Sequence, residues 1–233
     1  MRLLAIDVGN TRTKTALWEG GLRKEWDHMP VDMALASVTG EMPDWKQALP
    51  QAEVAVLTAE TPLPIRVDYR TPSTLGADRK AAACGAWALA KGKSCVVIDA
   101  GTCITIDLLD SDGVYQGGAI LPGLRMKFDA LNTFTARLPL LNIADGLAMP
   151  ADELTGKSTE ESMAVGVLAA TRLEVEAFVK RYRELYGSVE VIVTGGDAET
   201  IAPASAIIEK DLVLIGLKEI AESMIRKSEN RTL

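Results

Sequence analysis

Two short turns in this chain carry residues that could hold a metal-bound polyphosphate. Each follows an apolar run and contains Asp-x-Gly with hydroxyl or amide residues: DVGNTRTK begins at Asp7, and DAGTCITID begins at Asp99. Glycine lets the backbone approach a ligand closely, so that neighbouring N–H groups can converge on phosphate oxygens. An aspartate would repel phosphate, so its sensible role is to hold a cation, or the water shell of a cation, beside the phosphates.

The two turns also repeat one another. An alignment of LAIDVGNTRTKTAL with VVIDAGTCITIDLL matches Asp7 with Asp99, Gly9 with Gly101, and Thr13 with Thr105. One Asp-x-Gly turn is ordinary hairpin chemistry, but two copies indicate a duplicated domain. We therefore predict an N-terminal domain over residues 1–92 and a C-terminal domain over residues 93–233, each opening on a β-hairpin.

Two further glycine-containing stretches have competing interpretations. VIVTGGD, from Val191 to Asp197, ends a buried-type strand with two glycines, which suits either an adenosine pocket or a tight strand-to-helix turn. ADELTGKS, from Ala151 to Ser158, is similar to a phosphate-binding P-loop, but the preceding LAMPADEL does not read as a strand. We interpret it as a helix start with Ser158 as N-cap, Glu161 completing a capping box, and a solvated lysine.

The elements that must position these residues alternate in type along the chain. We expect a helical segment after the strands of each half, so the fold class is α/β. TPSTLG and GGAILPG read as loops. The predicted strands are 3–6, 13–17, 54–57, 65–69, 95–98, 104–108, 189–193 and 212–215, and the predicted helices are 78–91, 124–133, 159–186 and 217–227.

Composition excludes several classes of function. The 233 residues carry a net charge of -7, and no basic run is interleaved with aromatic residues, which argues against a nucleic-acid groove or a membrane patch. No stretch has the roughly 18 apolar residues of a spanning helix, and Asp7 interrupts the apolar run where a signal peptide would stay apolar. We therefore expect a cytoplasmic protein.

The cysteine and histidine content narrows the chemistry further. Cys84, Cys95 and Cys103 show neither a C-x-x-C pair nor zinc-ligand spacing, so we expect buried free thiols. His28 is the single histidine and lies in a polar stretch. A Ser-His-Asp hydrolase is improbable on this basis, and a carboxylate is the better candidate for a general base.

Taken together, the motifs resemble the type III pantothenate kinases of the acetate and sugar kinase, heat-shock protein and actin superfamily. The resemblance runs from residue 3 to about residue 200, whereas the stretch 19–51 carries no family signal. It implies two duplicated actin-like (ribonuclease H-like) domains with a cleft between them. The motifs that carry it, in order, are DVGNT, LGADR (75–79), DAGTCITID (99–107), GGAILPG (117–123), GKSTEESMAVG (156–166) and VTGGD.

The resemblance implies ATP-dependent phosphorylation of pantothenate to 4'-phosphopantothenate, the first committed step of coenzyme A synthesis. The implied cofactors are ATP, Mg²⁺ and a monovalent cation, K⁺ or NH₄⁺. The implied partners are pantothenate, ATP and a second copy of the chain. Cys103 stands where the family usually has alanine, a small substitution that should be tolerated.

The resemblance also assigns roles to individual residues. Asp78 would be the proton acceptor, Asp99 the monovalent-cation ligand, and Asp7 a magnesium ligand acting through water. Thr159 would contact pantothenate from the neighbouring subunit, which requires a homodimer. The implied ATP contacts are Asp7, Val8, Gly9, Asn10, Thr11, Arg12, Thr13, Lys14 and Thr102, and the implied pantothenate contacts are Tyr69, Gly76, Ala77, Asp78, Arg79 and Thr159.

Elementary chemistry agrees with several of these roles. Phosphoryl transfer needs a positioned hydroxyl, a carboxylate to take its proton and cations to offset charge. Asp78 opens a predicted helix, where the helix dipole favours a carboxylate. Arg79 could meet the carboxylate of pantothenate or form a surface ion pair. Tyr69 shares strand parity with Ile65 and Val67, so a core position and a ligand-facing hydroxyl both remain open.

Two other interpretations stay open at this point. The chain could be another superfamily kinase or a phosphatase with a different acceptor, for which LGADR would have no special use. It could instead be a non-catalytic ATP-binding regulator, although such a module would not need Asp7, Asp78 and Asp99 together. Asp107 has two interpretations as well, a second carboxylate near the metal or an outward strand residue, and we favour the latter.

Overall fold

The computed structural model describes residues 1–39, 44, 47, 49–146 and 153–229. The chain forms two compact units. The first contains Met1–Cys95, Asp107–Gly117 and the segment from Asp211 onward. The second consists of 96–106 and 118–210.

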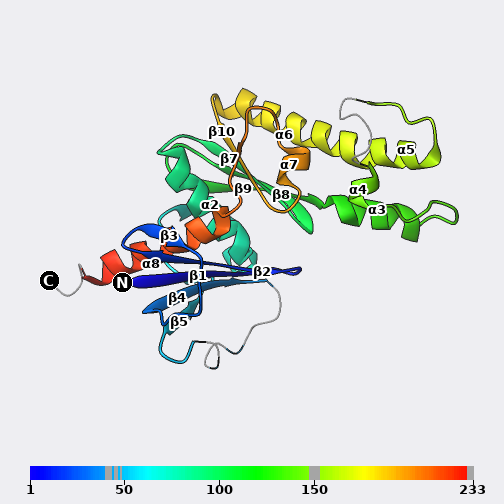
Figure 1. Cartoon of the computed structure of the whole chain (residues 1–233). Helices are drawn as coiled ribbons and strands as arrows, with labels where there is room; N and C mark the ends of the chain where they lie inside the picture. Colours follow the sequence, from blue (N-terminus) through cyan, green and yellow to red (C-terminus); the bar gives the residue numbers. More distant parts are fainter. Residues whose placement is uncertain (40–43, 45–46, 48, 147–152, 230–233) are drawn as a thin grey trace. The chain divides into compact units, whose positions relative to one another are not determined.

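A five-stranded sheet is the framework of the first unit, with strand order β3-β2-β1-β4-β5. Its central strand β1 is antiparallel to β2 and parallel to β4, which is in turn parallel to β5. The sheet is drawn in blue in Figure 1. Its strands are β1 (Arg2–Val8), β2 (Thr13–Glu19), β3 (Leu22–Lys24), β4 (Met33–Val38) and β5 (Glu53–Val56).

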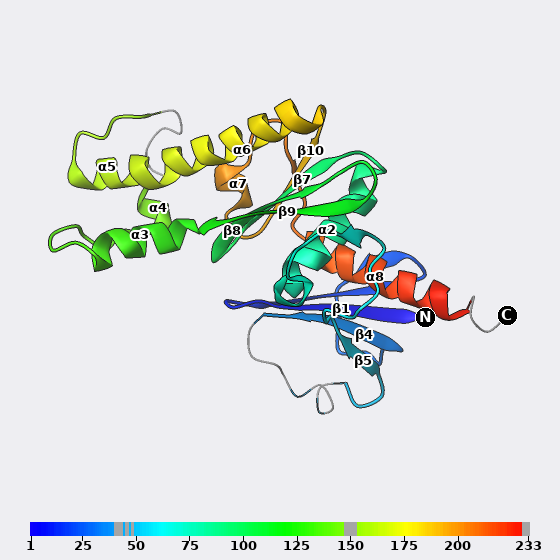
Figure 2. The ribbon, with the colours of Figure 1, turned by 180° about the vertical axis from the view of Figure 1, so that it is seen from behind.

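The two faces of this sheet bury different groups. Leu4, Ile6 and Val8 of β1 belong to one apolar cluster, which also takes in Val31 and Leu49 from loops. Helix α8 (Leu212–Glu229) contacts β1 and β4, helix α2 (Ala77–Ala90) contacts β4, and both lie on one side of the sheet in Figures 1 and 2. Because side chains alternate along a strand, Asp7 points away from the Ile6 cluster and toward the helices.

Glycines allow α2 and α8 to pack at very short distance. A Cβ placed on Gly216 would lie 1.7 Å from the carbonyl oxygen of Ala81, and one on Gly85 would lie 2.4 Å from that of Leu212. The prediction of a strand over 212–215 is wrong, because these residues form the first turn of α8. This turn is buried on nearly all sides, and a short apolar run of that kind looks the same in a buried strand and a buried helix.

A second sheet has six strands in the order β11-β10-β7-β8-β9-β6. Reading GGAILPG as a loop is wrong, because the stretch from Gly117 to Pro122 belongs to β9. Strand β6 pairs only with Val114 and Tyr115 of β9, so the rest of that edge can accommodate glycine and proline. The strands are β6 (Arg66–Val67), β7 (Cys95–Ala100), β8 (Cys103–Leu109), β9 (Val114–Pro122), β10 (Glu190–Thr194) and β11 (Ile207–Ile208).

The remaining helices belong to the second unit, apart from a 3-10 turn η1 at Pro72–Thr74. The predicted helix over 159–186 is present, with a π-helical stretch η2 (Val165–Ala169) inside it. Within the described ranges, no helix has both the length and the apolar character needed to cross a membrane. The other elements are α3 (Leu124–Thr133), α4 (Ile143–Gly146), α5 (Thr159–Ala164), α6 (Ala170–Tyr186) and α7 (Ala198–Ile201).

The predicted capping box at the start of α5 is confirmed. The Ser158 side chain accepts the N–H of Glu161, and the Glu161 carboxylate accepts the N–H of Ser158. Lys157 is exposed, as predicted. The interpretation of LAMPADEL as non-strand falls largely on residues 147–152, which lie outside the described residues.

Candidate functional site

The first Asp-x-Gly sequence forms the predicted hairpin turn between β1 and β2. Gly9 donates its N–H to the carbonyl of Arg12 at 3.1 Å, and residues 10–13 are exposed. In the strand register, Asp7 lies opposite Lys14 of β2 and Ser37 of β4. Three polar side chains from three neighbouring strands therefore share one face of the sheet, beside an exposed turn.

Asp7 is half-buried, and the positive charges of Lys14 and Arg12 and the negative charge of Asp78 all act on it. Its Oδ1 atom is buried and has no hydrogen-bond partner among the described residues. Burial, and then the negative charge of Asp78, raise the pKa of Asp7 from 3.8 to about 6, against smaller opposing effects of Lys14, Ser37 and Arg12. A buried carboxylate oxygen without a partner fits a ligand of a hydrated divalent cation.

Asp78 lies in the first turn of α2, as predicted. Its Oδ1 accepts the backbone N–H of Arg79 at 2.8 Å, and the carboxylate is half-buried. Gly76 precedes the helix as N-cap, and a Cβ on it would lie 2.4 Å from Asp78 Oδ1. Asp78 adds to the effect of burial in raising the pKa of both Asp7 and Asp107, so its carboxylate lies close to each of them.

Arg79 is buried in an ion pair rather than exposed on the surface. Its Nε donates to Asp107 Oδ2 at 3.1 Å, its Nη2 donates to Asp107 Oδ1, and the Tyr115 hydroxyl donates to the same Oδ1 at 2.8 Å. Burial disfavours the guanidinium charge, but the hydrogen bonds and charge of Asp107 outweigh it and raise the pKa of Arg79. The preferred interpretation of Asp107 as an outward residue is wrong, since only 2% of it is exposed.

Tyr69 lies against this buried network. Exposure alternates from Ile65 to Arg70 as predicted, with Ile65, Val67 and Tyr69 on the more buried side. The rings of Tyr69 and Tyr115 are 6.1 Å apart. Gly117 has a φ of +88°, and a Cβ there would lie 3.5 Å from the Tyr69 ring. The half-buried tyrosine thus lies beside a glycine in a backbone conformation that other residues rarely adopt.

The second Asp-x-Gly turn is supported by two other glycine segments. Gly101 donates its N–H to the backbone carbonyl of Cys103 at 3.0 Å, so the turn between β7 and β8 is shorter than the first. A Cβ on Gly123 would lie 2.4 Å from the carbonyl oxygens of Gly101 and Thr102. Gly195, with a φ of +96°, lies equally close to Ala100: a Cβ on Gly195 would lie 2.3 Å from the carbonyl oxygen of Ala100.

VTGGD therefore packs directly behind DAGT in the second unit. The N–H of Asp197 donates to the carbonyl of Ala100 at 3.0 Å. Asp99 is half-buried and Thr102 is exposed at the turn. Cys84 and Cys95 are buried free thiols, as predicted, whereas Cys103 is half-buried.

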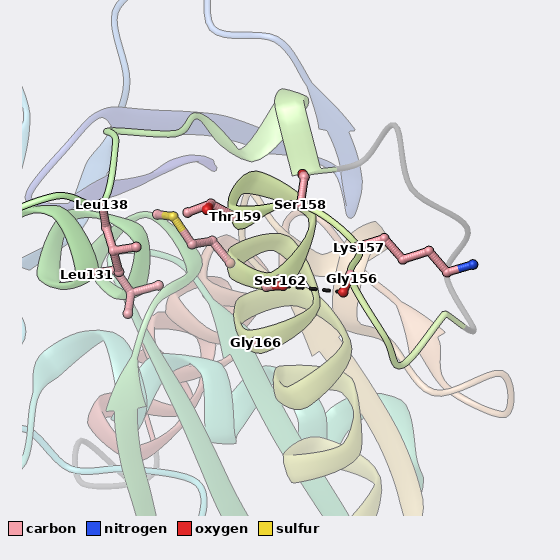
Figure 3. A pocket seen from close by; sticks show the side chains of 9 residues that line it. Leu131, Leu138, Gly156, Lys157, Ser158, Thr159, Ser162 and Gly166 are labelled. Atoms are coloured by element: carbon pink, nitrogen blue, oxygen red, sulfur yellow. Dashed lines mark hydrogen bonds between the residues drawn. The ribbon is translucent and has the colours of Figure 1, made fainter.

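Thr159 lies on the wall of a pocket of about 730 Å³ in the second unit. Figure 3 shows Leu131 and Leu138 on one side and the start of α5 on the other, while the Lys157 side chain extends away from the two leucines. The hydroxyl of Ser162 donates to the carbonyl of Gly156 at 3.4 Å. Thr159 itself is exposed.

Comparison with known proteins gives the family of the chain. A family model of type III pantothenate kinases matches residues 27–181, and the type III pantothenate kinase of Cytophaga hutchinsonii is 36% identical over 235 residues, covering 93% of this chain and 97% of the relative. The chain belongs to the type III pantothenate kinase family. The range matched by the type III pantothenate kinase model contains the positions of Asp78, Asp99 and Thr159.

Solved structures agree with the predicted actin-like α/β fold class. A conserved Campylobacter jejuni protein named as a Baf family transcriptional activator superposes with a TM-score of 0.64 at 21% identity, covering 96% of this chain and 99% of that one. The ROK hexokinase of Thermus thermophilus gives 0.52 at 13% identity, covering 97% and 100%. At these identities the likeness supports the fold of this pantothenate kinase family member.

Sequence reasoning missed Ser37 and Tyr115 of the first-unit site and did not foresee that Asp107 pairs with Arg79. Ser37 lies in the stretch 19–51, for which no strand was predicted, although ALAS is a short run typical of a buried strand. Asp107 and Tyr115 become partners of Arg79 only in the folded chain. The described part of the chain contains no group of three His, Cys, Asp or Glu residues arranged to hold a metal.

Proposed function

We propose that this protein transfers the γ-phosphoryl group of ATP to the hydroxyl of pantothenate, giving 4'-phosphopantothenate for coenzyme A synthesis. The family membership supports the reaction and the acceptor. The observation that carries the mechanism is the clustering of Asp7, Asp78 and the Arg79–Asp107 pair in one unit. The proposal includes a cytoplasmic location, where ATP is available.

Asp78 is the general base in this proposal. One carboxylate oxygen is fixed by the backbone N–H of Arg79, so the group has a defined orientation at the start of α2. It takes the proton of the pantothenate hydroxyl as the oxygen attacks the γ-phosphorus and the bond to ADP breaks. Tyr69, Gly76, Ala77 and Arg79 surround the acceptor, and Asp107 and Tyr115 hold the Arg79 side chain in place.

The exposed turn between β1 and β2 binds the phosphates of ATP. Residues 10–13 are exposed and carry two hydroxyls and an amide, and Lys14 adds a positive charge opposite Asp7. The buried, unpartnered Oδ1 of Asp7 supports a role as a ligand of Mg²⁺ through water. When bound, Mg²⁺ offsets the charge on the β- and γ-phosphates. We assign Thr102 to ATP and Asp99 to K⁺ or NH₄⁺.

An assay with alternative acceptors and salts tests this function. Purified protein with pantothenate, ATP and Mg²⁺ should release ADP and 4'-phosphopantothenate in equal amounts, and the rate should be higher in K⁺ than in Na⁺. The products are followed by a coupled ADP assay and by mass spectrometry. Phosphorylation of a sugar without phosphorylation of pantothenate would indicate a different acceptor, and nucleotide binding without ADP release would indicate a regulator.

Thr159 is proposed to contact pantothenate from the neighbouring subunit of a homodimer. Three large apolar residues that lie within a few positions of pocket-lining residues in the sequence are exposed: Phe134 at 85%, Leu154 at 64% and Leu140 at 52%. Exposed apolar groups of this size are typical of surfaces that another protein covers. Sedimentation should give a mass of twice 25.0 kDa. A monomer with full activity would contradict the role of Thr159.

A further inference from the structure

A buried hydroxyl on β4 makes no hydrogen bond of good geometry within the part of the chain that the structure describes. Ser37 is fully buried, and its Oγ makes no hydrogen bond of good geometry among the described residues, although its hydroxyl is close enough to Asp7 to lower the pKa of that carboxyl. It pairs with Asp7 in the register of the parallel strands β1 and β4. Asp7 Oδ1 is the other buried side-chain oxygen in the described part of the chain that lacks a partner. The two oxygens therefore belong to residues that are paired across neighbouring strands, on one face of the sheet.

Their position in the fold indicates a ligand rather than a packing defect. Buried polar groups are nearly always well hydrogen-bonded, so two neighbouring oxygens that lack a hydrogen bond of good geometry call for a group that binds both. Both residues lie at the carboxyl end of their strands, where α/β folds bind ligands. Asp78 from α2, Lys14 from β2 and Arg12 from the turn also act on Asp7 electrostatically, so this end of the strands is surrounded by charged groups.

We propose that Ser37 is a positioning residue for the divalent cation of the reaction. Its hydroxyl and Asp7 Oδ1 would together hold the water shell of the cation, and Ser37 would orient that water by hydrogen bonding. A hydroxyl can donate and accept, which a water between a carboxylate and a cation requires. This inference rests on the proposed function and adds to it a residue from the stretch without family motifs.

The decisive experiment compares Ser37→Ala with Ser223→Ala, a buried serine of α8 in the same unit. Mn²⁺ binding in the presence of a non-hydrolysable ATP analogue is followed by electron paramagnetic resonance. We expect Ser37→Ala to bind Mn²⁺ about tenfold more weakly and Ser223→Ala to bind as the wild type does. The thermal midpoint of metal-free Ser37→Ala should equal or exceed that of the wild type, because an unpartnered hydroxyl has been removed.

Each outcome has a distinct meaning. Wild-type affinity for Mn²⁺ in Ser37→Ala overturns the inference while leaving the proposed function intact. A lower thermal midpoint with unchanged Mn²⁺ affinity assigns Ser37 to packing and also overturns it. If the wild-type protein binds neither Mn²⁺ nor the analogue, the proposed function itself fails. Should Ser37→Ala not fold, Ser37→Cys, which keeps the size and weakens the hydrogen bonding, must show the same loss of Mn²⁺ affinity.

Discussion

Replacement of Asp78 by asparagine should lower kcat with pantothenate by roughly 100-fold to 10,000-fold. Asparagine has the same shape and can still accept the N–H of Arg79 through Oδ1, so the start of α2 is preserved. It cannot take a proton from the acceptor hydroxyl. The measurement is steady-state ADP release, with ATP affinity and the thermal midpoint recorded for the same sample, and both should stay near the wild-type values.

Asp68→Asn is a matched control for this experiment. Asp68 is an exposed carboxylate in the segment that leads to the same loop, and its backbone N–H already bonds to Tyr115. The control should turn over as the wild type does. If Asp78→Asn retained wild-type kcat, another group would have to act as base. A fall in ATP affinity with unchanged kcat would assign Asp78 to nucleotide binding instead.

Replacement of Asp7 by asparagine should have opposite effects on activity and stability. Loss of a metal-orienting carboxylate should lower kcat/KM about 1000-fold, equivalent to about 4 kcal/mol. In the metal-free protein, however, Asp7→Asn should be more stable than the wild type above pH 6. The pKa of Asp7 rises from 3.8 to about 6 on folding, chiefly through burial, so its ionisation opposes the folded state.

The sign of this effect gives it a defined pH range. Between about pH 3.8 and pH 6 the folded protein binds more protons at Asp7 than the unfolded chain does, so the Asp7 contribution makes stability fall as pH rises. Above pH 6 the cost stays at roughly 2 to 3 kcal/mol. Urea unfolding with a chelator at pH 4 and pH 8 should show the gain of Asp7→Asn only at pH 8. Equal stability at both values would mean that the ionised carboxylate is already satisfied without metal.

These two carboxylates differ in how they are held. Asp78 has one oxygen fixed by the backbone of its own helix, a local contact between adjacent residues. Among the described residues, Asp7 Oδ1 lacks a hydrogen bond of good geometry, and so does the Oγ of Ser37, which lies 30 residues away in sequence and opposite Asp7 in the sheet. The first arrangement suits a base that needs a set direction. The second suits a group completed by a bound cation.

The sequence by itself determined the features that depend on neighbouring residues. The Asp-x-Gly hairpins, the capping box of Ser158 and Glu161, and the alternation that places Tyr69 all involve residues a few positions apart. Turn geometry, cap hydrogen bonds and strand parity are fixed by the local chain, so their patterns can be read directly. The ordered motifs then gave the family and the α/β fold class.

Only the tertiary structure decided which distant residues meet. Arg79 and Asp107 are 28 residues apart and pair because strand β8 passes the start of α2. The run 212–215 is helical because close contacts at glycines pack α8 against α2. Residues 117–122 of GGAILPG are extended because they form part of strand β9 in the second sheet. The proposed role of Ser37 could be inferred only from the register of β4 against β1, which pairs it with Asp7. Local propensity is weak where burial and long-range packing determine the conformation, and each of these positions is of that kind.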